Sequence, residues 1–98
     1  MKISGTPIIE HFCKKHTDAE EDFVKWIEFV SNAKWKDHDE LEADYPSADY
    51  VGNERYVFNI KGNHYRLIVA IVFSIETIEV RFIGTHAEYD KIHDIQNI

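Results

Sequence analysis

The sequence predicts an α+β fold, in which an N-terminal helical hairpin packs on an antiparallel β-meander of three to four strands, with a short C-terminal helix. Apolar residues recur at helical spacing in the first third of the chain, and from Tyr56 the apolar period changes to two. A run of helices before a run of strands is typical of a sheet with helices on one face. At 98 residues, the chain is expected to form a single domain, residues 1–98.

Two N-terminal helices are expected to begin at residues 6 and 17. Thr6 is a suitable N-cap, and Pro7 suits the first helical position. Residues 17–20 read as a capping box. The apolar stripes are Ile8, Ile9, Phe12, Cys13 and His16 in the first helix, and Phe23, Trp26, Ile27 and Val30 in the second, which Val24 widens. The second helix should end near Asn32, and the close succession of the two predicts a hairpin.

A connecting loop is predicted for residues 34–49, with a possible short helix at residues 37–42. Pro46 ends any helix there, because proline restricts the residue before it and cannot continue a helix. The expected elements after the loop are strands at 56–60, 64–73 and 78–83, joined by turns at 61–63 and 74–77. Gly84 ends the meander, and residues 85–88 read as a second capping box that opens the last helix.

The period of two divides the central strand into two faces. Tyr65, Leu67, Val69, Ile71 and Phe73 form the bulkier apolar face, which should meet the helices. Arg66 then faces the open side of the sheet, as can Arg81, which alternates with Ile78, Val80 and Phe82. His86 lies in the first turn of the last helix, Tyr89 one turn later, and Lys91 follows. These groups are expected to converge at one end of the open face.

Charge is unevenly distributed along the chain. The net charge is −7, which argues against broad electrostatic binding to nucleic acid. Residues 1–50 hold six lysines and twelve acids, whereas all three arginines lie in the second half. An anion site is therefore expected in the second half. No apolar run is long enough for a membrane span or a signal peptide, and Cys13 is the lone cysteine, so a cytoplasmic protein is expected.

The expected cluster suits phosphodiester cleavage without a metal. Histidine exchanges protons near neutral pH, and arginine holds phosphate oxygens through a charged fork. Tyrosine stacks on bases or moves a proton. Each residue also has a structural alternative: Arg66 can pair with a surface acid such as Glu79, and Tyr89 can pack at the rim. A weaker alternative is a metal site of His86, Asp90 and His93, whose third ligand the spacing does not fix.

Residues 56–70, YVFNIKGNHYRLIVA, and residues 85–90, THAEYD, resemble the core and the C-terminal signature of the HigB toxins of bacterial type II toxin–antitoxin systems. Residues 46–49 fit the family's loop before the sheet, and Trp35 fits a tryptophan that precedes it. The order and spacing of these matches are more specific than any one of them, and they cover well over half of the chain.

The resemblance implies a RelE-like fold and a ribosome-associated mRNA endoribonuclease that uses no cofactor or metal. It implies Arg66, Arg81, His86 and Tyr89 as catalytic residues, and Lys61, Asn63, His64 and Lys91 as contacts to RNA or the ribosome. It also implies a HigA-type helix-turn-helix antitoxin as partner, with operator DNA bound only through the complex. The rival interpretation is a non-catalytic binding module of the same fold, which acts through its acidic first half.

Overall fold

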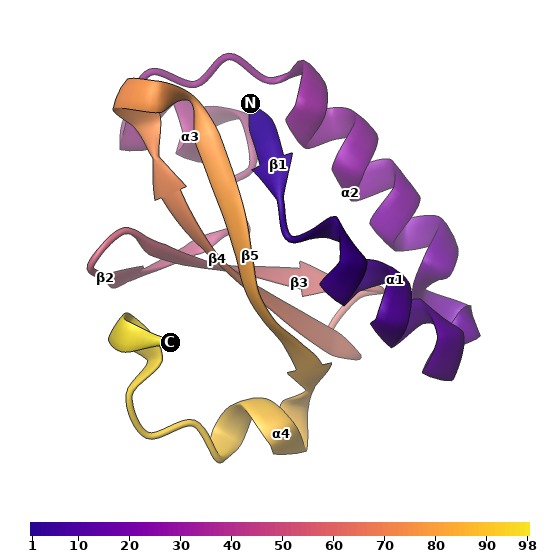
Figure 1. Ribbon diagram of the computed structural model, residues 1–98. Helices are drawn as coiled ribbons and strands as arrows, with labels where there is room; N and C mark the ends of the chain where they lie inside the picture. Colours follow the sequence, from indigo (N-terminus) through magenta and orange to yellow (C-terminus); the bar gives the residue numbers. More distant parts are fainter.

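The computed structural model describes residues 1–98, which form one five-stranded sheet with helices packed on it (Figure 1). The strand order is β1-β5-β4-β3-β2. The strands are β1 (Lys2–Ser4), β2 (Asp49–Gly52), β3 (Arg55–Ile60), β4 (Tyr65–Val72) and β5 (Thr77–Thr85). The predicted antiparallel meander is confirmed as β3-β4-β5, and β2 adds the further edge strand. The parallel pairing of β1 with β5 was not predicted.

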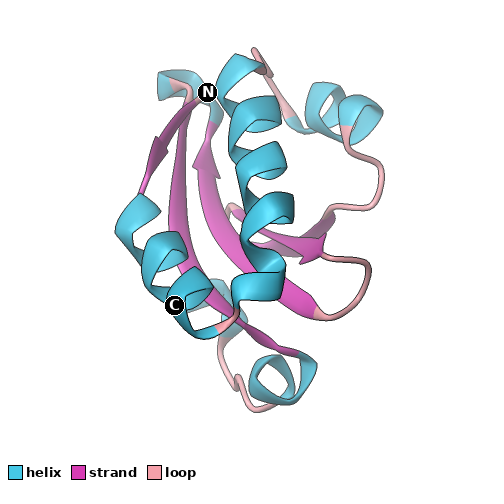
Figure 2. Ribbon diagram, turned by 90° about the vertical axis from the view of Figure 1, so that its right-hand side faces the viewer, coloured by secondary structure: helices cyan, strands magenta, loops and turns pink.

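Two helices cover one face of the sheet (Figure 2). They are α1 (Thr6–Lys15) and α2 (Glu20–Asn32), and a 3-10 turn, Thr17–Ala19, joins them. The helix α3 (His38–Asp44) precedes β2, and α4 (His86–Asp90) follows β5. Two further 3-10 turns are Phe73–Ile75, between β4 and β5, and Ile95–Asn97, in the C-terminal segment. The helical hairpin and the short last helix are therefore confirmed.

Helix starts differ from the expectation at two of the four positions. Gly5, with φ of +85°, is the N-cap of α1, so the helix begins one residue earlier than a Thr6 cap requires. Thr17 makes no side-chain capping bond, because the chain first forms the 3-10 turn and α2 begins at Glu20. The short helix expected at residues 37–42 extends to Asp44 as α3, and the Asp37 carboxylate accepts the N–H of Glu40 at 3.0 Å.

The main core lies between α1, α2 and the helix-facing side of the sheet. Phe23, Trp26 and Val30 of α2 are almost fully buried against Phe58 of β3 and Leu67 of β4. The Trp26 and Phe58 rings meet edge to face, with centroids 5.5 Å apart. The apolar face predicted for the central strand is thus the one that contacts the helices, which turns Arg66 toward the other side.

A β-bulge interrupts the β4–β5 ladder beside Arg81. Val69 pairs with Val80, but Ile68 pairs with Phe82, so Arg81 has no partner in β4. Because of this extra residue, the alternation changes phase. Ile83, rather than Phe82, packs against the helix-side core, so the expected grouping of Phe82 with Ile78 and Val80 is wrong.

The other face of the sheet is only partly open. Val57 and Ile68 are 2% and 0% exposed, yet they are absent from the helix-side core. The segment after β5 turns back beneath this side through α4 and the yellow C-terminal residues (Figure 1). The face that carries the candidate site is therefore a partly covered surface, not the exposed sheet that the sequence suggested.

Candidate active site

Arg66 and Tyr89 form a stacked pair where β4 begins and β5 passes into α4. The guanidinium carbon of Arg66 lies 4.5 Å from the centroid of the Tyr89 ring. A guanidinium over an aromatic face is held by the ring quadrupole. The Arg66 Nε atom is buried and has no hydrogen-bond partner. Arg66 is thus held in place by the ring while at least one of its donors remains unused.

His86 is the first residue of α4, and its position is fixed by the capping box around it. Thr85 Oγ1 accepts the Glu88 N–H at 3.2 Å, and Glu88 Oε1 accepts the Thr85 N–H at 2.8 Å. The Thr85 N–H first, and then the Thr85 side chain, hold the pKa of the Glu88 carboxyl below its ordinary value. The predicted capping box is confirmed. His86 Nε2 is buried and has no hydrogen-bond partner.

Gly84 allows the sheet and α4 to approach each other behind this site. It pairs with Arg66 across the ladder. A Cβ built on Gly84 would lie 2.6 Å from the Phe82 ring and 3.1 Å from the Glu88 Cβ, so a larger residue would push α4 away. Glycine at this position therefore helps to set the distance between Arg66 on the strand and His86 and Tyr89 on the helix.

Arg81, the fourth predicted catalytic residue, lies apart from the other three. Its position is three residues before Gly84, about 10 Å along β5 at roughly 3.3 Å per residue. Its Nη1 forms an ion pair with Glu79, and its Nε donates to the main-chain oxygen of Ile98 at 2.8 Å. Arg66, His86 and Tyr89 are thus brought together at one end of the sheet, whereas Arg81 lies farther along it.

Arg55 is a basic residue of this face that was not among the predicted site residues. Its Nη2 donates to the same Ile98 oxygen at 2.8 Å, and its Nη1 donates to the Asn53 main-chain oxygen at 3.0 Å. The sequence does indicate this position. In a strand with a period of two, Arg55 lies on the same face as Val57 and Asn59, opposite the helix-facing Tyr56 and Phe58.

The residues expected to contact RNA lie around the β3–β4 turn and after α4. Asn63, His64 and Lys91 are exposed. Lys61 donates from Nζ to Asp18 Oδ2 at 2.9 Å, and Asp18 also accepts the Tyr65 hydroxyl at 2.8 Å. These bonds, Lys61 first, lower the pKa of Asp18, and the bond to Asp18 raises that of Lys61. Lys61 thus meets any RNA as part of an ion pair.

The metal alternative finds no matching geometry. His86, Asp90 and His93 do not bring ligand atoms together; the cluster that does so is His38, Asp39 and Glu42, exposed on α3. Both ring nitrogens of His38 already have partners, Tyr56 Oη at 2.8 Å and Glu42 Oε2 at 2.9 Å. A metal ion would have to compete with these bonds.

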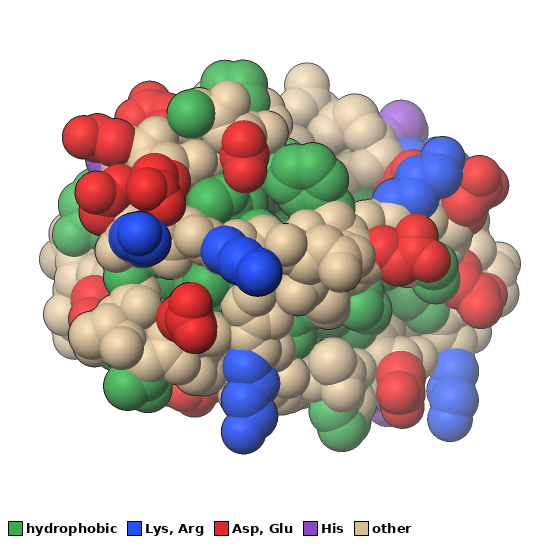
Figure 3. Space-filling view, turned by 90° about the horizontal axis from the view of Figure 1, so that it is seen from above, with side chains coloured by type: hydrophobic (Ala, Val, Ile, Leu, Met, Phe, Trp, Pro, Cys, Tyr) green, Lys and Arg blue, Asp and Glu red, His purple; other side chains and the backbone are tan.

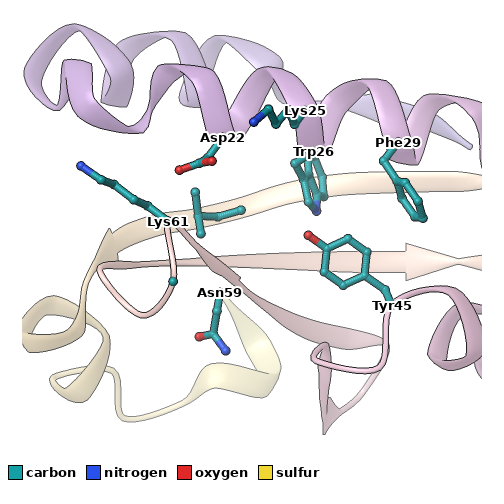
Figure 4. A pocket seen from close by; sticks show the side chains of 9 residues that line it. Asp22, Lys25, Trp26, Phe29, Tyr45, Asn59 and Lys61 are labelled. Atoms are coloured by element: carbon teal, nitrogen blue, oxygen red, sulfur yellow. The ribbon is translucent and has the colours of Figure 1, made fainter.

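A hollow of about 430 Å³ lies on the helix side, between α2 and the β3–β4 turn. Trp26, Phe29 and Tyr45 line its inner part, while Lys25 and Lys61 extend away from these rings (Figure 4). The face seen from above mixes acidic, basic and hydrophobic side chains, with no continuous basic area (Figure 3). Neither feature adds a residue to the Arg66 end of the sheet.

The arrangement at that end offers the groups that phosphodiester chemistry needs. A fixed guanidinium can bind and neutralise phosphate oxygens, and an imidazole nitrogen can accept or donate a proton. No helix in the structure is long and apolar enough to cross a membrane.

Comparison with known proteins identifies the family to which this chain belongs. The chain is 29% identical over 93 residues to the mRNA interferase toxin HigB of Escherichia coli K12, covering 92% of this chain and 88% of that protein. The mRNA interferase HigB of Shigella flexneri matches over the same lengths with the same identity. Residues 19–92 match the family described as HigB_toxin, the RelE-like toxic component of a toxin-antitoxin system. With most of its length matched, the chain belongs to the HigB toxin family.

Proposed function

We propose that this toxin is an mRNA interferase, an endoribonuclease that cuts mRNA on the ribosome and so stops translation in the bacterial cytoplasm. The carrying observation is the Arg66 guanidinium held over the ring of Tyr89, which shares the short helix α4 with His86, together with buried, unpartnered nitrogens on Arg66 and His86. The relatives that are named mRNA interferases share most of its length.

The proposed chemistry is metal-free attack of the 2′-hydroxyl on the neighbouring phosphorus, which forms a 2′,3′-cyclic phosphate and breaks the bond to the 5′-oxygen. His86 either accepts the proton of the attacking hydroxyl or donates a proton to the leaving 5′-oxygen, and water exchanges the other proton. Arg66 stabilises the charge that develops on the phosphate oxygens. Arg81, farther along the face, contributes to phosphate binding. Tyr89 keeps Arg66 in place through its ring. Lys61, Asn63, His64 and Lys91 contact RNA or the ribosome.

Dependence on the ribosome follows from the charge of the protein. With a net charge of −7, it gains little from the general attraction to phosphates that drives nonspecific binding to nucleic acid. The scissile phosphate must therefore be positioned by another component, and positioning contributes many powers of ten to a rate. A translating ribosome presents mRNA in a fixed conformation and so supplies this positioning.

A toxin of a toxin-antitoxin system has an antitoxin partner. We propose that this partner is a HigA-type helix-turn-helix protein and that operator DNA is bound only through the complex of the two proteins. The acidic first half of the toxin, with six lysines against twelve acids, favours a partner with basic side chains. Co-purification with the product of a neighbouring helix-turn-helix reading frame tests this pairing.

The deciding experiment is translation in a reconstituted system, with the integrity of a reporter mRNA read by primer extension. The wild-type protein is expected to cut the mRNA during translation and to leave the same mRNA intact without ribosomes. Exposed residues far from the site provide matched controls: His11→Ala on α1 for His86→Ala, and Lys25→Ala on α2 for Arg66→Ala.

The outcomes separate the proposal from its rivals. Efficient cleavage of free mRNA at low protein concentration would show that the site positions its own substrate. Intact mRNA in the presence of a folded wild-type protein would favour the non-catalytic binding module. Growth arrest on expression in cells, relieved by His86→Ala but not by His11→Ala, would agree with the enzyme.

A further inference from the structure

Two arginines of the sheet share a single acceptor, an oxygen of the last residue, Ile98. Arg55 Nη2 and Arg81 Nε both donate to the main-chain oxygen of Ile98, each at 2.8 Å. The two residues come from β3 and β5, on either side of β4. Convergence of two guanidinium groups on one oxygen is a geometry that suits an anionic oxygen of a phosphate group.

The arginine pair retains donors beyond this shared bond. Arg55 Nε is buried and has no partner. Arg81 Nη1 faces the carboxylate of Glu79, and Arg55 Nη1 donates to a main-chain oxygen. When the Ile98 oxygen is displaced, the two guanidinium groups face only the carboxylate of Glu79, and a phosphate can neutralise the positive charge that remains.

The segment Asp94–Ile98, which we call the strap, is held by hydrogen bonds to β2 and the β2–β3 turn. Asn53 Nδ2 donates to the Gln96 main-chain oxygen at 2.7 Å, and Gln96 Nε2 donates to the Val51 main-chain oxygen at 2.9 Å. Gly52, with φ of +98°, makes room: a Cβ there would lie 2.6 Å from Gln96 Nε2. These two bonds are exposed, so water can replace them when the strap moves, whereas the bond from Arg55 to Ile98 is partly buried.

The register places this arginine pair at a distance from the Arg66 end. Arg55 pairs with Ala70 of β4, four residues beyond Arg66, which is about 13 Å at roughly 3.3 Å per residue. One phosphate cannot contact both ends. A strand of RNA bound at Arg66 would instead place a different phosphate of the same strand near Arg55 and Arg81.

We propose that Arg55 and Arg81 form a second phosphate subsite for the RNA strand, and that the strap covers it in the free protein, with the Ile98 oxygen in the place of a phosphate oxygen. RNA binding displaces the strap and exchanges that oxygen for a phosphate. The proposal rests on the proposed function, since it assumes that RNA is the ligand of this face.

Binding of RNA that cannot be cleaved tests the subsite separately from catalysis. The probe is a short, fluorescently labelled 2′-O-methyl RNA, which lacks the attacking hydroxyl, and affinity is measured by anisotropy at low ionic strength. Gln96→Ala and deletion of residues 94–98 are expected to bind the probe several-fold more tightly than the wild type. Asn32→Ala, an exposed change on α2, is the matched control and should bind as the wild type does.

The dependence on arginine is the decisive part of this test. Arg55→Gln should weaken binding, cancel the gain from the deletion and flatten the salt dependence of affinity, with Arg55→Lys recovering part of each. NMR of the Arg81 Nε–H reports whether the strap has opened, and thermal unfolding verifies the fold of each variant. Unchanged affinity in a folded deletion variant, or in a folded Arg55→Gln variant, would overturn the proposal. Arginine-dependent binding without any cleavage during translation would instead overturn only the proposed enzymatic function.

Discussion

The guanidinium of Arg66 lies over the ring of Tyr89, 4.5 Å from its centroid, and this pair joins the central strand to the last helix. The contact uses the face of the ring and not its hydroxyl. This geometry agrees with the positioning role that we propose for Tyr89 toward Arg66.

Substitutions at Tyr89 and Arg66 separate positioning from charge. Tyr89→Phe is expected to retain most of the cleavage rate because it keeps the ring, whereas Tyr89→Ala should lower it by releasing Arg66. Arg66→Ala should reduce cleavage by about 10²–10³-fold, as does the loss of one group that stabilises transition-state charge. Primer extension during translation measures each rate. A Tyr89→Phe variant as slow as Tyr89→Ala would assign proton transfer to the hydroxyl instead.

His86→Ala is expected to lower the cleavage rate by about 10²–10⁴-fold, the usual contribution of a positioned acid or base. The protein should remain folded, since His86 is only half-buried and does not belong to the core. Circular dichroism verifies the fold, and His11→Ala on α1 is the matched control. Wild-type toxicity in a folded His86→Ala variant would remove this residue from the mechanism.

Cleavage is expected to need no metal of its own. Protein treated with a chelator and then dialysed should cut mRNA in a translation reaction to which only magnesium is restored, because ribosomes require that ion. The histidine and arginines proposed here supply proton transfer and charge stabilisation without it. Activity that returned only with added zinc or manganese would redirect attention to His86, Asp90 and His93.

Acid should weaken the cap of α4 through Glu88. The pKa of the Glu88 carboxyl is lowered in the folded protein, chiefly by the Thr85 N–H. Its contribution to the stability of the fold is therefore fully present at pH values above the ordinary pKa of glutamate, about 4.3. It is lost as the pH falls through the lowered value of the folded state. Urea unfolding from neutral to acidic pH should show this loss in the wild type. In Glu88→Gln that part of the pH dependence should be absent, and identical pH profiles would contradict the assignment.

The sequence predicted the sheet and the helix-covered face because long segments show their period. Residues 65–73 alternate over enough positions to distinguish the helix-facing residues from Arg66. β1 was missed because its three residues are too few to show a period, and its pairing with Thr77, Ile78 and Glu79 depends on contacts distant in sequence.

The candidate site was predicted in part for similar reasons. The capping box at Thr85 places His86 and Tyr89 locally, so their position beside Arg66 follows from pattern and register. The contact of Arg55 with Ile98 joins residues 43 apart, and no local pattern indicates it. Phe82 was assigned to the wrong face because a period of two assumes an uninterrupted ladder.

Arg81 can be regarded as a single-residue insertion in an otherwise regular strand. Val80 pairs with Val69 and Phe82 with Ile68, so the ladder would close, with every neighbour on its present face, if Arg81 were deleted. Deletion should therefore be tolerated by the fold while it removes an arginine from the surface that we assign to RNA. Loss of this arginine can thus arise among related proteins through a change in strand length as well as through substitution.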